Sequence, residues 1–121
     1  GNYGGQAIQA GGWKPLVDFL NGLRADHLVL ELAHRPDADL EALKDVGEQI
    51  AIGVGVIDIK VNHVETPDGV AGRIDRAVRA LGPGRVKWVH PDCGFWMLKR
   101  SVADRKIEAL VQGRDLFLGR A

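Results

Sequence analysis

The chain has 121 residues, of which 45% are hydrophobic and 26% charged, and this composition is typical of one small globular domain with a core. Sixteen basic residues balance sixteen acidic ones, so the formal net charge of zero argues against nucleic acid or an anionic membrane as a partner. No apolar run approaches the roughly 18 residues of a membrane span, and a single cysteine cannot form an internal disulfide, so we expect a cytoplasmic protein.

The chain opens with a glycine-rich loop. Residues 1–5 read Gly-Asn-Tyr-Gly-Gly, two more glycines follow at 11 and 12, and no initiator methionine is present. Because such a loop normally follows another element, we expect the chain to be a piece of a longer protein.

Hydrophobic periodicity and turn residues divide the rest of the chain into alternating helices and strands. In chain order the pattern predicts a helix over 15–23, a strand over 27–32, a short helix over 39–46, a strand over 50–58, a helix over 66–81, a strand over 86–89, a helix over 101–111 and an apolar tail over 116–118. This alternation predicts a parallel sheet with right-handed crossovers. Three strands are too few for a closed barrel, so the fold is either a small open sheet or the last part of a (β/α)₈ barrel.

The only cysteine, Cys93, follows the third predicted strand in the run His-Pro-Asp-Cys-Gly-Phe-Trp over residues 90–96. The carboxyl end of a strand is where α/β proteins place their chemistry. A free cysteine is also one of the most buried residue types and often acts as a small hydrophobe. The neighbouring Asp92 and Gly94 argue against a packed core position. Local context leaves both interpretations open.

Glu31 interrupts the apolar run of the first strand and Asp58 closes the second, so both are expected near one rim of the sheet together with Cys93. A buried carboxylate is costly unless it is paired or binds a cation. The structural partner would be Arg35 or His34, and the functional alternative is a metal such as zinc, for which glutamate oxygen and cysteine sulfur are suitable ligands.

Aromatic and basic residues near the cysteine have two interpretations each. Trp88, inside an apolar strand, is predicted to be core, with a ring-stacking platform as the alternative. Phe95 and Trp96 either line a pteridine or other substrate pocket or cover a hydrophobic edge. The basic residues Lys99, Arg100, Arg105 and Lys106 are predicted to form a solvated helix face, with the binding of an anionic substrate as the alternative.

Several of these motifs together resemble the catalytic barrel of the cobalamin-independent methionine synthase family and its shorter relatives. The resemblance covers nearly the whole chain. It includes Leu-Glu at 30–31, the run Gly-Val-Gly-Val-Ile-Asp-Ile-Lys over 53–60, Val-Glu-Thr at 64–66 and Pro-Asp-Cys-Gly at 91–94. The last two motifs are fairly specific.

The resemblance implies that the chain is the C-terminal part of one (β/α)₈ TIM-barrel catalytic domain, spanning residues 1–121. It further implies a Zn²⁺ ion held by Glu31, Cys93 and a His-x-Cys pair, which would fall before Gly1. In the family, zinc binds a thiol such as homocysteine as thiolate, and a methyl group is transferred to it from methyltetrahydrofolate. Relatives alkylate other thiols, including coenzyme M with epoxides.

One departure from the family concerns the proton donor. Methionine synthases of the family carry a histidine two residues after Asp58, where this chain has Lys60, and His63 follows three residues later. Either residue could serve in proton transfer, and Lys60 could instead bind an anionic group of the substrate. This substitution favours a relative with another acceptor or donor.

A different class of function stays open beside the enzyme. The chain could be a non-catalytic α/β binding module, with Glu31 neutralised by an arginine and Cys93 inert. As a separate piece of a barrel we expect it to be inactive, with open sheet edges that favour pairing with another copy.

Overall fold

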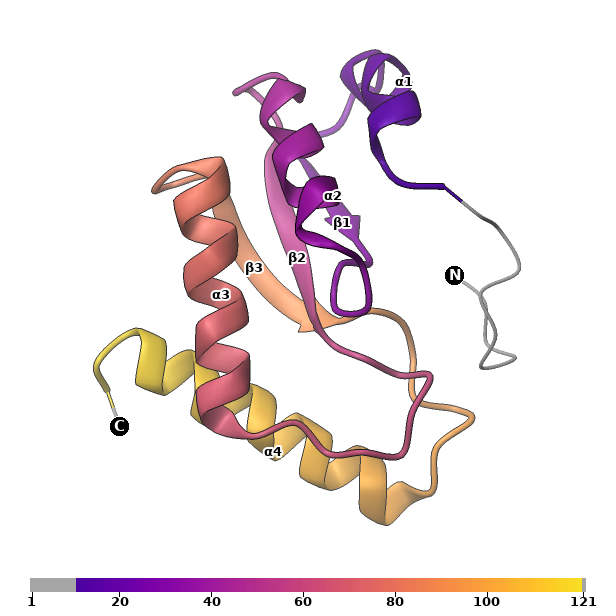
Figure 1. Cartoon of the computed structure of the whole chain (residues 1–121), viewed down its shortest axis with the longest axis vertical. Coiled ribbons are helices and arrows are strands. Elements are labelled where there is room, and N and C mark those ends of the chain that lie inside the picture. Colours follow the sequence, from indigo (N-terminus) through magenta and orange to yellow (C-terminus); the bar gives the residue numbers. More distant parts are fainter. Residues whose placement is uncertain (1–10, 121) are drawn as a thin grey trace.

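The computed structural model describes residues 11–120, so the predicted loop at residues 1–5 lies outside the described part (Figure 1). Strands and helices alternate along the chain as predicted. Their bounds are η1 Lys14–Leu16, α1 Val17–Asn21, β1 His27–Leu30, α2 Asp37–Ala42, η2 Leu43–Asp45, β2 Ala51–Ile57, α3 Pro67–Leu81, β3 Val86–Pro91 and α4 Arg100–Phe117.

The three strands form a parallel sheet in the order β1-β2-β3, which confirms the predicted α/β fold class. The central strand, β2, has six of its seven residues buried. Its neighbours are less buried: β1 alternates, with only Leu28 and Leu30 buried, and β3 has no fully buried residue. A continuous apolar run therefore marks the middle strand, which has a neighbouring strand on each side.

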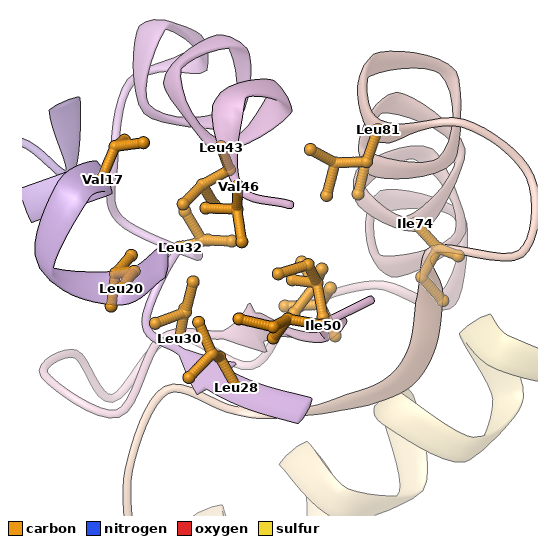
Figure 2. Packing of buried hydrophobic residues seen from close by; sticks show 14 of the residues in the cluster. Val17, Leu20, Leu28, Leu30, Leu32, Leu43, Val46, Ile50, Ile74 and Leu81 are labelled. Atoms are coloured by element: carbon orange, nitrogen blue, oxygen red, sulfur yellow. The ribbon is translucent and has the colours of Figure 1, made fainter. Parts of the chain in front are cut away.

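The hydrophobic core lies between one face of the sheet and helices α1, α2 and α3 (Figure 2). Leu28 and Leu30 of β1 point into it, and Ile74 and Leu81 of α3 close it from the other side. The apolar residues of α3 recur at helical spacing, as the sequence predicts. This helix begins after Thr66, whose Oγ1 accepts a hydrogen bond from the Gly69 N–H, and Gly82 follows its end with a φ of 94°.

The opposite face of the sheet is open in the described residues. Val29, Gly53 and Trp88 form one row across it, and Val29 and Trp88 are 60% and 49% exposed. The prediction that Trp88 is core is therefore wrong for this part of the chain. Its ring packs instead on His27, with the ring centroids 4.4 Å apart. Period-two alternation in an edge strand puts every second residue on the uncovered face.

The last helix is longer than predicted. It continues past 111 to Phe117 and includes part of the expected apolar tail. Gly113, within this extension, is buried, and a Cβ there would lie 2.5 Å from the Val70 side chain. The glycine therefore permits α4 to cross close to α3, as seen at the bottom of Figure 1. In residues 11–120 no helix is long and apolar enough to cross a membrane.

Candidate functional site

Each strand is followed directly by polar residues, among them residues that the sequence analysis considered as candidates for the functional site. Glu31 comes after the last residue of β1, Asp58 after β2, and Asp92 and Cys93 after β3. The first strand ends at Leu30 rather than at 32, so Glu31 stands at the end of the strand and not inside it. Since parallel strands end at the same edge of a sheet, these residues share one rim.

Asp92 ties the end of β1 to the turn after β3. Its Oδ1 accepts hydrogen bonds from the N–H groups of Leu32 and Ala33, at 2.9 and 3.0 Å, and its Oδ2 lies 2.9 Å from His34 Nδ1. The side chain of Asp92 is fully buried. The sequence singles out Asp92 only as a neighbour of Cys93 and as part of the Pro-Asp-Cys-Gly motif, because its main-chain partners lie 59 and 60 residues away.

The side chains of Asp92 and His90 occupy space that the glycines of β2 leave open. A Cβ on Gly55 would collide with Asp92 Oδ1 and lie 3.0 Å from the Leu30 carbonyl oxygen. A Cβ on Gly53 would lie 3.3 Å from His90 Nε2. Small residues on the middle strand thus leave room for the polar side chains of β3.

Glu31 is partly buried between two cations. Its Oε1 accepts a 3.0 Å hydrogen bond from Arg35, and its Oε2 lies 3.7 Å from Lys60 Nζ. Burial acts to raise the pKa of Glu31, but the hydrogen bond from Arg35 and the charges of Lys60 and His34 outweigh it. The net pKa is lowered from its ordinary value of 4.5. The carboxylate is therefore held ionised.

The loop after β2 brings Lys60 to Glu31. Asp58 Oδ1 accepts a 2.8 Å hydrogen bond from the Lys60 N–H, which closes a tight turn, and the Lys60 side chain is only 10% exposed. His63, further along this loop, is exposed, and its main-chain carbonyl accepts a hydrogen bond from Lys106. The structure therefore puts Lys60 at Glu31 and leaves the His63 residue largely in solvent.

A buried ion pair that the sequence pattern did not predict lies beneath this loop. Lys106 is 0% exposed, which makes its assignment to a solvated face wrong, and it pairs with Glu65 at 3.0 Å. The signal was present in the spacing: Val102, Lys106, Ala109 and Gly113 recur every three or four residues and form the buried stripe of α4. A lysine on this stripe needs an acidic partner inside the fold.

The residues after β3 take up different positions. Cys93 is partly buried and its thiol is free. Phe95 packs against the hydrophobic core, which fits the role of covering an apolar edge, and Trp96 is 68% exposed.

The sequence model of the protein family described as "Cobalamin-independent synthase, Catalytic domain" matches residues 12–114. The chain belongs to this family. A methionine synthase of Thermococcus kodakarensis is 33% identical over 101 residues, which are 84% of this chain and 30% of that protein. A methionine synthase of Saccharolobus islandicus is 32% identical over 103 residues, or 85% of this chain and 31% of that protein. The chain thus spans about a third of the length of these curated relatives.

A solved structure shows the same fold. The B12-independent methionine synthase from Shewanella sp. W3-18-1, determined in complex with selenomethionine, matches with a TM-score of 0.74 at 23% identity, over 88% of this chain and 30% of that one. The parallel strands and helices of the chain therefore fold as part of a TIM barrel.

Two features of the chain suit a bound cation. Among residues 11–120, Glu31 Oε2 is a buried oxygen that accepts no hydrogen bond. In addition, His34, Asp58 and Asp92 offer ligand atoms that all lie within 4.8 Å of one another, although His34 and Asp92 already engage each other. An ionised carboxylate with a buried oxygen that accepts no hydrogen bond fits zinc chemistry, although Lys60 Nζ lies 3.7 Å from this oxygen. Arg35 forms an ion pair with Oε1 of Glu31, which is one of the two structural partners predicted from the sequence.

Proposed function

We propose that the polypeptide containing this chain transfers a methyl group from methyltetrahydrofolate to a thiol such as homocysteine, with Glu31 and Cys93 as two ligands of Zn²⁺. The observation that carries the proposal is the buried Oε2 of Glu31, which accepts no hydrogen bond and lies at the rim that also bears Cys93. Membership of the cobalamin-independent synthase family and two relatives named methionine synthase support it. The remaining His-x-Cys ligands and barrel strands would come from outside residues 1–121, and we expect the chain alone to be inactive.

Asp92 gives the proposed site its geometry. Asp92 directly precedes Cys93. It accepts hydrogen bonds from the N–H groups of Leu32 and Ala33, the two residues that follow Glu31. One buried carboxylate therefore connects the turn after β3 with the end of β1, because Asp92 lies 60 residues from Leu32 and 59 from Ala33 in the sequence. We infer that this link helps to hold the proposed ligands Glu31 and Cys93 in place.

Lys60 is the proposed proton-handling residue in place of the family histidine. When bound, zinc would lower the pKa of the acceptor thiol so that it is held as thiolate at neutral pH. The amine leaving group of the donor needs a proton during transfer. Lys60 carries protons at Nζ beside Glu31, and Asp58 sets its main-chain conformation. Phe95 and Trp96 are proposed to border the substrate pocket, and His63 is the alternative donor.

Two observations support other functions. Lys60 in place of histidine favours a related zinc-dependent alkyltransferase, such as one that joins coenzyme M to an epoxide, since a lysine can also bind a sulfonate. The Arg35–Glu31 ion pair is the feature expected of a non-catalytic binding module. Methionine formation from homocysteine and methyltetrahydrofolate, compared with product formation from coenzyme M and an epoxide, separates the two enzymes.

Zinc content tests the site itself. The polypeptide, expressed at its natural length, should bind about one zinc per chain by elemental analysis. Glu31→Ala and Cys93→Ser should each weaken zinc affinity by at least about tenfold, because each removes a ligand. Glu41→Ala is the matched control, because Glu41 is an exposed carboxylate paired with Lys44, and it should retain zinc. A polypeptide without zinc after loading would contradict the thiol-activation mechanism and favour the binding module.

A further inference from the structure

Lys106 is a fully buried cation that the proposed chemistry does not use. It lies on α4, outside the rim that carries Glu31 and Cys93, and its side chain is 0% exposed. Burying a lysine ammonium is costly unless hydrogen-bond acceptors replace the lost water. The identity of these acceptors indicates what the residue does.

The acceptors of Lys106 are main-chain atoms on both sides of Lys60. Its Nζ donates to the Asp58 carbonyl oxygen at 2.8 Å and to the His63 carbonyl oxygen at 2.6 Å. Both carbonyls belong to the loop that follows β2. One ammonium therefore connects the beginning and the end of the segment that presents Lys60.

Glu65 completes this arrangement. Its carboxylate lies 3.0 and 3.2 Å from Lys106 Nζ and accepts a 3.0 Å hydrogen bond from the Asp58 N–H. Arg73 lies 3.8 Å from the same carboxylate and donates to the Val56 carbonyl oxygen at 2.7 Å. The N–H and the carbonyl of Asp58 are thus both held by the buried pair.

The two main-chain carbonyls replace water around the buried ammonium, and by the same contacts they tie two points of the loop after β2 to α4. Replacing a buried ion pair by apolar residues of similar volume is often neutral or stabilising, so stability alone does not explain Lys106. The contacts with Asp58 and His63 instead set the course of the loop, and through the Asp58–Lys60 turn they set the place of Lys60 Nζ beside Glu31.

We propose that Lys106, together with Glu65, is a positioning residue that acts from α4 on the loop after β2 and so places Lys60 at Glu31. The role of this loop in catalysis rests on the proposed function. The position of the loop does not, and it can be measured without substrate or metal.

The test separates stability from loop position. In the double variant Glu65→Leu, Lys106→Met of the polypeptide at its natural length, the ion pair is replaced by apolar residues, and we expect a melting temperature within a few degrees of the original. Hydrogen exchange of the Lys60 amide, which donates to Asp58 Oδ1, should become at least about tenfold faster, whereas the amides of β2 should exchange as before. Glu41→Leu, Lys44→Met, the same change in an exposed pair, should leave the Lys60 amide unaffected.

Each outcome decides the proposal. A stable double variant whose Lys60 amide exchanges at the original rate would overturn it. If the double variant does not fold, Lys106→Arg takes its place with the same criterion, because a guanidinium keeps the charge but cannot bring one donor atom to both carbonyls. Faster Lys60 exchange in a polypeptide that neither binds zinc nor transfers methyl groups would retain the positioning role and reject only the proposed function.

Discussion

The charge state of Glu31 depends on its neighbours more than on its own burial. Its pKa is lowered although burial acts in the opposite direction, because Arg35 donates a hydrogen bond to it and Lys60 and His34 contribute favourable charge. A carboxyl group whose pKa is lower in the folded state stabilises the fold above its unfolded pKa. This contribution is lost as the pH falls through the folded pKa.

Arg35→Met should therefore raise the pKa of Glu31. Burial still raises this pKa in the variant, and the Arg35 hydrogen bond that lowers it is removed. The variant should be less stable than the original above pH 4.5, and the difference should shrink as the pH falls through the folded pKa. Carboxyl-carbon NMR titration and unfolding at several pH values measure both effects. Lys44→Met, beside the exposed Glu41, should leave the Glu31 titration unchanged. An unchanged Glu31 pKa in Arg35→Met would contradict this expectation and show that Lys60 and His34 alone are enough to keep the Glu31 pKa low.

Residue type alone misplaced Lys106 and Trp88. Lysine is normally exposed and tryptophan in an apolar run is normally buried, and here the lysine is 0% and the tryptophan 49% exposed. Each exception has a tertiary cause. Glu65 and two carbonyls from a distant loop offset the charge of Lys106, whereas no element among residues 11–120 covers the sheet face on which Trp88 lies.

At the scale of elements, the boundaries of strands and of α3 followed local signals closely. Thr66, Pro67 and Gly82 mark the ends of α3 in the sequence and in the structure. The end of α4 lies beyond the predicted end at residue 111, and the extension contains Gly113. The lack of a side chain at Gly113 accommodates Val70 of α3, and the helix continues to Phe117.

Gly113→Ala should therefore destabilise the fold despite the higher helix propensity of alanine. The new Cβ would lie 2.5 Å from Val70 and 2.8 Å from the Pro67 carbonyl oxygen, and overpacking of this kind costs about 1–3 kcal/mol. Gly72→Ala in α3 is the control: its Cβ would lie 3.8 Å from Arg76, and it should stabilise by about 0.5–1 kcal/mol. Urea unfolding compares the two. A stabilised Gly113→Ala variant would mean that α3 and α4 separate easily.

At the scale of the whole molecule, the sheet has an uncovered face and two outer strands. Since the order is β1-β2-β3, β1 and β3 each pair on one side only in residues 11–120. Val29 and Trp88 add exposed apolar surface to this face. Unpaired strand edges and exposed apolar patches favour association.

We expect residues 1–121, expressed alone, to self-associate through these edges. Sedimentation velocity should show species larger than a monomer that increase with concentration. Val29→Lys with Trp88→Lys should shift the population toward monomer, because charge on this face opposes stacking. Phe19→Lys, on the exposed surface of α1, is the matched control and should not. A chain that stays monomeric at all concentrations would exclude this association.

The sequence by itself determined the order and type of the elements, the parallel sheet and the resemblance to the cobalamin-independent synthases. These follow from periodicity, turn residues and local motifs, which act over a few neighbouring positions. Only the tertiary structure decided that Asp92 joins the segments of Glu31 and Cys93, that Lys60 meets Glu31, and that Lys106 lies buried under the loop. These contacts span 29 to 60 residues, so they depend on how the strands and α4 pack and on no local pattern.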